Sequence, residues 1–170
     1  MVERQVQRVR EAEARQAPIY ENIYTMYNSW KERAETGEVV IRGKELTWEQ
    51  GRQGRVKFYL EPLRKDLAAQ GWLVFVQDIR NHSGRHRHQG GLIIYVLEGK
   101  GWTTVDGVRH DWEEGDIILL PIQARGSEHQ HFNSEPGKPC KWMAMIYLHF
   151  VECISSELEQ KATSPDWTHA

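Results

Sequence analysis

The feature that most constrains the fold of this chain is a series of short apolar segments separated by turn residues. From Val39 onward these segments are rich in β-branched and aromatic residues. We expect strands at residues 39–41, 56–60, 72–79, 92–97, 102–105, 117–120, 128–132 and 141–150. Turn residues stand between several of them, and the Asp106-Gly107 pair is typical of a hairpin. Strands at this even spacing favour an all-β sandwich or barrel.

The first third of the chain has helical periodicity instead. Val2, Val6 and Val9 recur at helical spacing, and Pro18 then interrupts or restarts the helix. A stronger apolar stripe follows, formed by Ile19, Ile23, Met26, Tyr27 and Trp30, and Gly37 ends it. We expect this stripe to pack against the body of the protein or a second subunit. A shorter helical turn is predicted at residues 62–70, closed by Gly71.

These patterns predict three regions. An N-terminal helical extension covers residues 1–36, a β-barrel covers 37–154 with its most informative motifs at 72–147, and a polar C-terminal tail covers 155–170. The tail is expected to form a short helix followed by a disordered end.

Composition excludes several classes of function. A chain of 170 residues is long enough for one domain with its own core. A formal net charge of −2 gives no support for nucleic-acid or anionic-membrane binding, and no apolar run could span a bilayer. The N-terminus lacks an apolar signal region, and the two cysteines, Cys140 and Cys153, read as ordinary thiols. We therefore expect a cytoplasmic protein.

Two histidine clusters on predicted strands carry the chemistry. Because alternate residues of a strand face the same side, His86 and His88 can present two imidazoles to one point, and His129 can add a third from a partner strand. Three neutral nitrogens on one side of a metal leave its other side open, which a catalytic metal needs. We predict one divalent metal per chain on His86, His88 and His129.

The residues around these histidines resemble the two motifs of the cupin superfamily. Gly84, His86, His88 and Gly99 fit the first motif, and Gly115, Pro121, His129 and Asn133 fit the second. The resemblance covers roughly residues 72–147. It implies a double-stranded β-helix, the jelly-roll barrel of the cupins, here with an added N-terminal helical segment.

One departure from the cupin pattern indicates which group of cupins the chain resembles. Leu92 stands where most cupins place a glutamate ligand, so the carboxylate is missing. The local sequence is similar to the gentisate-dioxygenase-like cupins, which bind ferrous iron with three histidines only. The resemblance therefore implies Fe(II), with Zn, Ni and Mn as alternatives, since imidazole suits all of these metals.

Further residues have candidate roles at the site. His131 shares a strand face with His129, and we favour an acid–base or supporting role for it over a fourth ligand position. Asn133 is expected to be structural, and Arg85 and Arg87 to point outward. His82, His110 and His149 read as loop or surface residues. Possible pocket-lining residues are Gln77, Tyr95, Trp142, Met143 and Tyr147.

The function expected from these residues is dioxygen-dependent oxidation or cleavage of a small chelating substrate, such as a hydroxylated aromatic acid. A site without a carboxylate ligand keeps the full +2 charge of its metal, which favours a substrate that chelates through two oxygens. The alternatives are a non-oxidative metal-dependent isomerase, lyase or decarboxylase, and a metal-bearing binding module without catalysis. The expected partners are the substrate, O2 and a second copy in a homodimer.

Overall fold

The computed structural model describes residues 18–168, which divide into two compact units. The smaller unit contains residues up to Val39 together with Asp66–Ala69. Its helix α2 covers Ile19–Thr36, begins after Pro18, and ends where the Gly37 N–H donates to the Arg33 carbonyl over 2.8 Å. The predicted helix and its stop at Gly37 are therefore confirmed, whereas the stripe of Val2, Val6 and Val9 lies outside the described residues.

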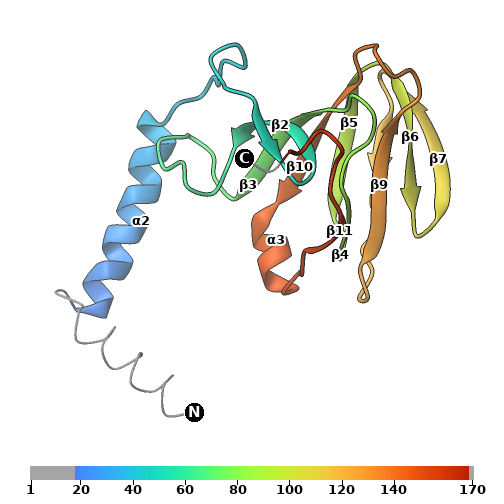
Figure 1. Ribbon diagram of the computed structural model, residues 1–170. Helices are drawn as coiled ribbons and strands as arrows, with labels where there is room; N and C mark the ends of the chain where they lie inside the picture. Colours follow the sequence, from blue (N-terminus) through green and yellow to red (C-terminus); the bar gives the residue numbers. More distant parts are fainter. Residues whose placement is uncertain (1–17, 169–170) are drawn as a thin grey trace. The chain divides into compact units, whose positions relative to one another are not determined.

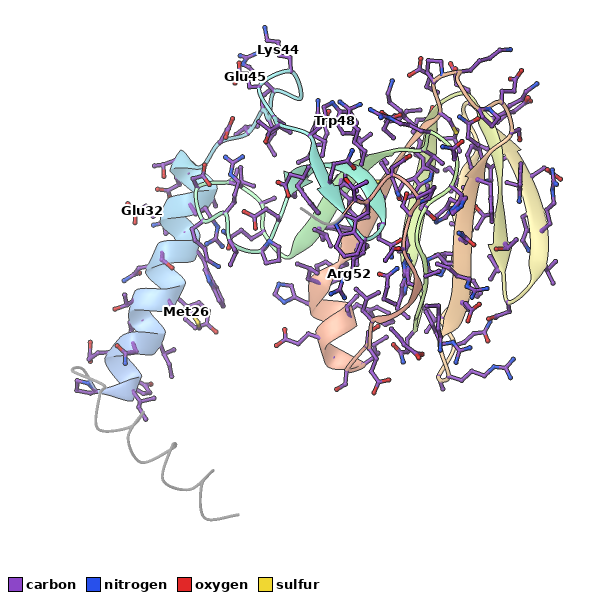
Figure 2. The ribbon with its side chains drawn as sticks, in the orientation of Figure 1. Met26, Glu32, Lys44, Glu45, Trp48 and Arg52 are labelled. Atoms are coloured by element: carbon purple, nitrogen blue, oxygen red, sulfur yellow. The ribbon has the colours of Figure 1, made fainter. Side chains whose placement is uncertain are left out.

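The apolar stripe of α2 is exposed. Ile19 is 61% exposed, Trp30 44% and Met26, labelled on the helix in Figure 2, 41%. Within the helix, Tyr27 packs edge-on against Trp30 with 5.1 Å between ring centroids. Packing of this stripe against the body or a second subunit stays a prediction.

Two predicted elements near this helix are wrong. Residues 39–41 form no strand and residues 62–70 form no helical turn. Instead, Glu38 makes an isolated parallel bridge with Leu67, and Ala68 N–H donates to the Glu38 carbonyl over 3.0 Å. The backbone groups of residues 66–68 are thus satisfied across the chain rather than by a local helical turn.

The larger unit, residues 40–65 and from Gln70 onward, is built from two antiparallel sheets (Figure 1). The six-stranded sheet has the order β1-β2-β3-β10-β5-β8. Its strands are β1 (Glu49–Gly51), β2 (Gly54–Leu60), β3 (Trp72–Asp78), β10 (Lys141–Tyr147), β5 (Leu92–Glu98) and β8 (Ile117–Leu119).

The second sheet has five strands in the order β11-β4-β9-β6-β7. They are β11 (Glu159–Ala162), β4 (Arg85–His88), β9 (Ser127–Asn133), β6 (Lys100–Val105) and β7 (Val108–Glu113). The β6–β7 hairpin turns at Asp106 and Gly107, with φ of 48° and 84°, as the Asp-Gly pair predicts. The predicted all-β jelly roll with an N-terminal helix is confirmed.

The core lies between the inner faces of these sheets. Ile94, Val96 and Ala144 are fully buried, and Trp112 from β7 and Trp142 from β10 join the same apolar cluster. Burial alternates along β5, with Leu92, Ile94 and Val96 inside and Ile93, Tyr95 and Leu97 outside. One sheet therefore supplies most of the apolar filling, and the other supplies polar side chains to the interior.

The C-terminal segment differs from the predicted polar tail. After β10 the chain forms α3 (Leu148–Cys153), where a strand was expected to continue, and then β11 pairs with β4 (Figure 1). Ser164 is 2% exposed, and its hydroxyl donates to the His82 carbonyl over 3.0 Å. The predicted disordered end is wrong for residues 159–164, because backbone pairing orders them. Neither described helix has the length and apolar character that a membrane crossing needs.

Gly90, next to strand β4, is expected to tolerate alanine poorly. Both Gly90 and Gly107 have φ of +84°, so alanine is strained at either position by about 1–2 kcal/mol. A Cβ at Gly90 would also overlap the Pro121 carbonyl oxygen, whereas one at Gly107 meets nothing within 4 Å. Urea unfolding should therefore show Gly90→Ala losing about 1–3 kcal/mol more than Gly107→Ala. Equal losses would contradict this steric account.

Candidate metal centre

Strands β4 and β9 place three histidines on the inner face of the five-stranded sheet. His86 pairs with His129 and His88 with Ser127 in the antiparallel register. Along β9 burial alternates strictly, with His129 and His131 inside and Glu128 and Gln130 on the other face. Because paired residues of neighbouring strands share a face, His86, His88 and His129 all point into the barrel.

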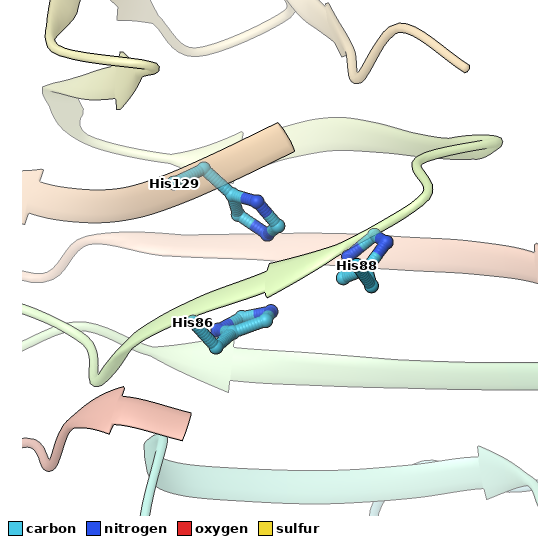
Figure 3. Close-up of side chains that lie close together, drawn as sticks. All are labelled: His86, His88 and His129. Atoms are coloured by element: carbon cyan, nitrogen blue, oxygen red, sulfur yellow. The ribbon is translucent and has the colours of Figure 1, made fainter. Parts of the chain in front are cut away.

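The three rings converge on one point (Figure 3). Their ring centroids are 4.2 Å apart for His86 and His129, 4.7 Å for His88 and His129, and 5.4 Å for His86 and His88. One potential ligand nitrogen from each lies within 4.8 Å of the others. Within residues 18–168, this is the group of histidine, cysteine and acidic side chains with metal-binding geometry. The predicted ligand set is thus brought together.

Burial keeps these imidazoles neutral. Burial, then the neighbouring His129 and His88, lower the pKa of His86 from 6.5 to about 2. Burial and His88 lower the pKa of His129 to about 4, and burial lowers that of His88. Four histidines including His131 share this interior, and each protonation would place a cation beside the others. Neutral rings have free lone pairs, as a metal site needs.

Hydrogen bonds determine which nitrogen of each imidazole carries the proton and which has a lone pair available for a metal. The Ser127 carbonyl, 3.1 Å from His129 Nδ1, can only accept, so Nδ1 carries the proton and Nε2 is free. His86 Nδ1 is buried without a hydrogen-bond partner among the described residues. Gly90 N–H donates to His88 Nδ1 over 3.0 Å, which places the proton of the neutral ring on Nε2. A metal at His88 Nε2 would therefore require this bond to break or the ring to turn.

The donor set fits a divalent first-row metal. Imidazole nitrogens bind zinc at about 2.0–2.1 Å, so two ligands of one metal lie at most about 4.2 Å apart. Nitrogens within 4.8 Å of one another need only small side-chain rotations to reach that distance. The orphaned Nδ1 of His86 and the free Nε2 of His129 are consistent with this role. His86, His88 and His129 would hold the ion.

No carboxylate completes this set in the described part of the chain. Leu92, at the position of the usual cupin glutamate, is 6% exposed and packs in the apolar core. His131 also stands outside the group, although its ring centroid is 5.6 Å from that of His129. Its side chain is buried, and its Nδ1 lies 2.7 Å from Thr103 Oγ1. The candidate centre therefore consists of three histidines with a fourth imidazole, that of His131, beside them.

The predicted pocket residues divide between the two faces of the six-stranded sheet. Trp142 is 3% exposed and faces inward, with its ring centroid 4.8 Å from that of His131. Gln77 pairs with Trp142 and is buried, but its amide donates to the Gln53 carbonyl. The prediction is wrong for Tyr95, Met143 and Tyr147. They lie on the outer face, and Tyr95 and Tyr147 are 40% and 44% exposed.

Three other residues discussed in the sequence analysis form ion pairs or hydrogen bonds that stabilise the fold. Arg85 and Arg87 point outward as expected, and both pair with Glu128, at 3.5 and 3.6 Å. Asn133 Nδ2 donates to the carbonyls of Ile79 and Lys138, both at 3.0 Å, as expected for a structural asparagine. Two further residues near the site, Thr103 and Trp112, were not predicted. Thr103 Oγ1 hydrogen-bonds to both Trp112 Nε1 and His131 Nδ1. The only sign of them in the sequence is their position in the predicted hairpin, where alternate residues face the interior.

Acidification is expected to destabilise the metal-free protein. Histidine in the unfolded chain titrates near pH 6.5, whereas the folded pKa of His86 is about 2 and that of His129 about 4. Below pH 6.5 the unfolded state therefore binds more protons, and stability falls as pH falls, by up to about 1.4 kcal/mol per pH unit for each histidine that stays neutral. Urea unfolding between about pH 7 and 5 measures this slope. His129→Gln should reduce it, and a flat profile would contradict neutral burial.

Comparison with known proteins finds similarity over part of this chain. Residues 73–147 match the cupin domain family. The jelly-roll fold and the inward-facing histidines agree with this match, which covers less than half of the chain. Solved structures agree in fold. The polyketide cyclase RemF from Streptomyces resistomycificus has a TM-score of 0.55 at 17% identity, covering 76% of this chain and 89% of its own.

Part of the chain is similar in sequence to two gentisate 1,2-dioxygenases. It is 44% identical over 52 residues to gentisate 1,2-dioxygenase from Streptomyces sp, and 34% identical over 67 residues to that from Ralstonia sp. These matches cover 30% and 39% of this chain but only 14% and 18% of the relatives. A salicylate 1,2-dioxygenase from Pseudoaminobacter salicylatoxidans, in complex with gentisate, has a TM-score of 0.53 at 21% identity, covering 86% of this chain and 39% of its own.

Proposed function

We propose that this chain is a mononuclear non-haem Fe(II) dioxygenase that acts on a small chelating substrate, such as a hydroxylated aromatic acid. The observation that carries the proposal is the convergence of three neutral histidines without a carboxylate in the described cupin domain. The local similarity to gentisate 1,2-dioxygenases supports the choice of reaction and of iron.

The charge of the site supports a chelating anionic substrate. Three neutral imidazoles leave the +2 charge of a bound metal uncompensated, so a ligand with adjacent hydroxyl and carboxylate oxygens would neutralise it. The metal would supply a binding position for both substrate oxygens and for O2.

The surrounding side chains would orient the substrate and exclude water. Trp142 covers one side of His131 with an apolar ring, and the buried His129 and His131 keep this end of the site dry. His131 would hold a proton beside the substrate and pass it to a developing oxygen anion. A dry interior strengthens each of these hydrogen bonds.

The test is metal analysis combined with oxygen uptake. Tag-free protein purified under nitrogen should contain about one iron per chain, or accept one on reconstitution. Oxygen consumption should follow addition of gentisate or salicylate, with 1,4-dihydroxybenzene, which lacks the carboxylate, as the matched control. Stoichiometric zinc, nickel or manganese without oxygen uptake would overturn the oxygenase in favour of a non-oxidative metal enzyme. Tight ligand binding without turnover would favour a binding module.

The proposal includes a homodimer in the cytoplasm. Its support is an apolar outer face across β5 and the edge strand β8, where Ile93, Tyr95, Ile117 and Leu119 are 40–68% exposed. Contiguous apolar surface of this kind is typical of an interaction site. Light scattering should give twice the chain mass for the wild type and the single mass for Ile117→Lys/Leu119→Lys. A monomeric wild type would contradict the dimer.

A further inference from the structure

A chain of buried hydrogen bonds leads from the outer hairpin to His131. Trp112 Nε1 on β7 lies 2.9 Å from Thr103 Oγ1 on β6, and the same oxygen lies 2.7 Å from His131 Nδ1 on β9. Thr103 is fully buried, His131 is 2% exposed and Trp112 5%. The three residues therefore hydrogen-bond to one another without competition from solvent.

The donor and acceptor of the hydrogen bond between Trp112 and Thr103 follow from the chemistry of the two groups. An indole N–H can only donate, so Thr103 Oγ1 accepts from Trp112. The threonine hydroxyl keeps one hydrogen of its own, and within the described residues its other hydrogen-bond partner is His131 Nδ1.

The second bond follows from this constraint. If His131 Nδ1 carried a proton, the Thr103 hydroxyl hydrogen would be buried without an acceptor, at a cost of about 1–3 kcal/mol. If Nδ1 is bare, the hydroxyl donates to it, and Trp112 Nε1, Thr103 Oγ1 and His131 Nδ1 are all paired. The neutral ring then carries its proton on Nε2, at the opposite side of the ring from Thr103.

We propose that Thr103 and Trp112 are positioning residues that hold His131 in its Nε2–H tautomer, so that it offers the metal centre a hydrogen-bond donor and not a fourth ligand. The proposal refines the role given to His131 in the proposed function. It uses the neighbouring three-histidine centre but does not depend on which reaction occurs there. A ring that presents N–H to the site can donate to a substrate oxygen and cannot bind the metal through the same nitrogen.

Two neighbours support this arrangement. Gly101 lies opposite Trp112 in the register, and a Cβ at Gly101 would collide with the Trp112 ring. Glycine therefore gives the indole the room it needs to reach Thr103. From the opposite sheet, the Trp142 ring packs on His131 with 4.8 Å between centroids, which restrains rotation of the imidazole.

The test is the tautomer of His131 in full-length protein labelled with ¹⁵N-histidine. Long-range ¹H–¹⁵N spectra distinguish a protonated from a bare ring nitrogen, and the metal-free and zinc-loaded forms are both diamagnetic. His131→Gln assigns the resonance. We expect His131 to be protonated on Nε2 in both forms, with the Nδ1 resonance shifted upfield by an accepted hydrogen bond. Protonation on Nδ1, or loss of the Nε2 proton on zinc loading because Nε2 binds the ion, would overturn the proposal.

Variants separate positioning from packing. Thr103→Val keeps the shape of the side chain but removes the hydroxyl, so the Nδ1 resonance should move downfield, whereas Thr103→Ser should restore the wild-type value. Trp112→Phe removes the N–H that orients the Thr103 oxygen but supplies no acceptor for its hydrogen, so the Nε2–H tautomer should persist with a weaker bond at Nδ1 and a smaller upfield shift. Trp102→Phe, on the other face of β6, is the matched control and should change nothing. An unchanged Nδ1 resonance in Thr103→Val would overturn the positioning role.

Failure of this proposal is distinguishable from failure of the proposed function. The spectra are recorded without iron and without substrate, so they do not depend on oxygen uptake. If a variant fails to fold, the wild-type spectrum alone still decides the tautomer.

Discussion

Replacing His129 by alanine is expected to reduce metal binding from about one ion per chain to background. His129 is 1% exposed, and its ring stands closest to both other ligands, with centroids 4.2 and 4.7 Å away. Without it, His86 and His88 provide two nitrogens, which hold a divalent ion far more weakly than three. Elemental analysis after dialysis, with circular dichroism to confirm the fold, measures the effect.

A matched control distinguishes the loss of a metal ligand from the loss of any histidine side chain. His110 on β7 is exposed and lies outside the cluster, so His110→Ala should keep full metal content. The cavity left by His129→Ala should cost about 0.5–3 kcal/mol of stability, which the fold can survive. Retention of half or more of the metal in His129→Ala would contradict the assigned ligand set.

Replacing His131 by alanine is expected to preserve metal content and to lower the rate of oxygen uptake by about 10²–10⁴-fold. His131 lies next to the ligands but outside the converging group, so its loss removes a proton donor and leaves the three ligands in place. The measurement pairs elemental analysis with kcat determined by an oxygen electrode.

The control for His131 is His149→Ala, since His149 is exposed on α3 and should leave the rate unchanged. Loss of metal in His131→Ala would instead make this residue a fourth ligand. An unchanged rate with full metal content would restrict its role to packing.

Most strands and the convergence of His86, His88 and His129 could be predicted because their signals are largely local. A His-x-His pair on a strand puts both imidazoles on one face whatever the rest of the fold does, and the pairing of His86 with His129 follows from the cupin topology. The turn at Asp106-Gly107 likewise depends on the backbone preferences of those residues. Gly37 differs, since its φ is −66° and glycine is needed there because a Cβ would lie 2.6 Å from the Ala68 nitrogen.

The inward face of the long apolar strands could not be predicted in this way. Residues 92–97 are all apolar, so alternation does not reveal that Ile94 is buried and Tyr95 exposed. The same ambiguity affects Trp142 and Met143 on β10. The assignment depends on register with neighbouring strands, which only the three-dimensional fold fixes.

Other elements carry too little hydrophobic signal to be recognised. Strand β11 has the sequence Glu-Gln-Lys-Ala, and it forms because the edge of β4 offers free backbone groups. Most of β7 is exposed, with Trp112 its one buried residue. The bond from Trp112 to Thr103 joins two side chains across a hairpin, and no spacing rule identifies such a contact.

The place of β4 between β9 and β11 has a consequence for when the site can form. Strand β4 is short, and its partners begin at Ser127 and Glu159, far downstream in the chain. On the ribosome, His86 and His88 emerge well before either partner strand, so a nascent chain exposes two flexible imidazoles with no third to join them. Closing such long loops is slow, because the entropy of the chain is lost before the stabilising contacts between the strands form. The three histidines can therefore converge only after β9 has been synthesised and has paired with β4.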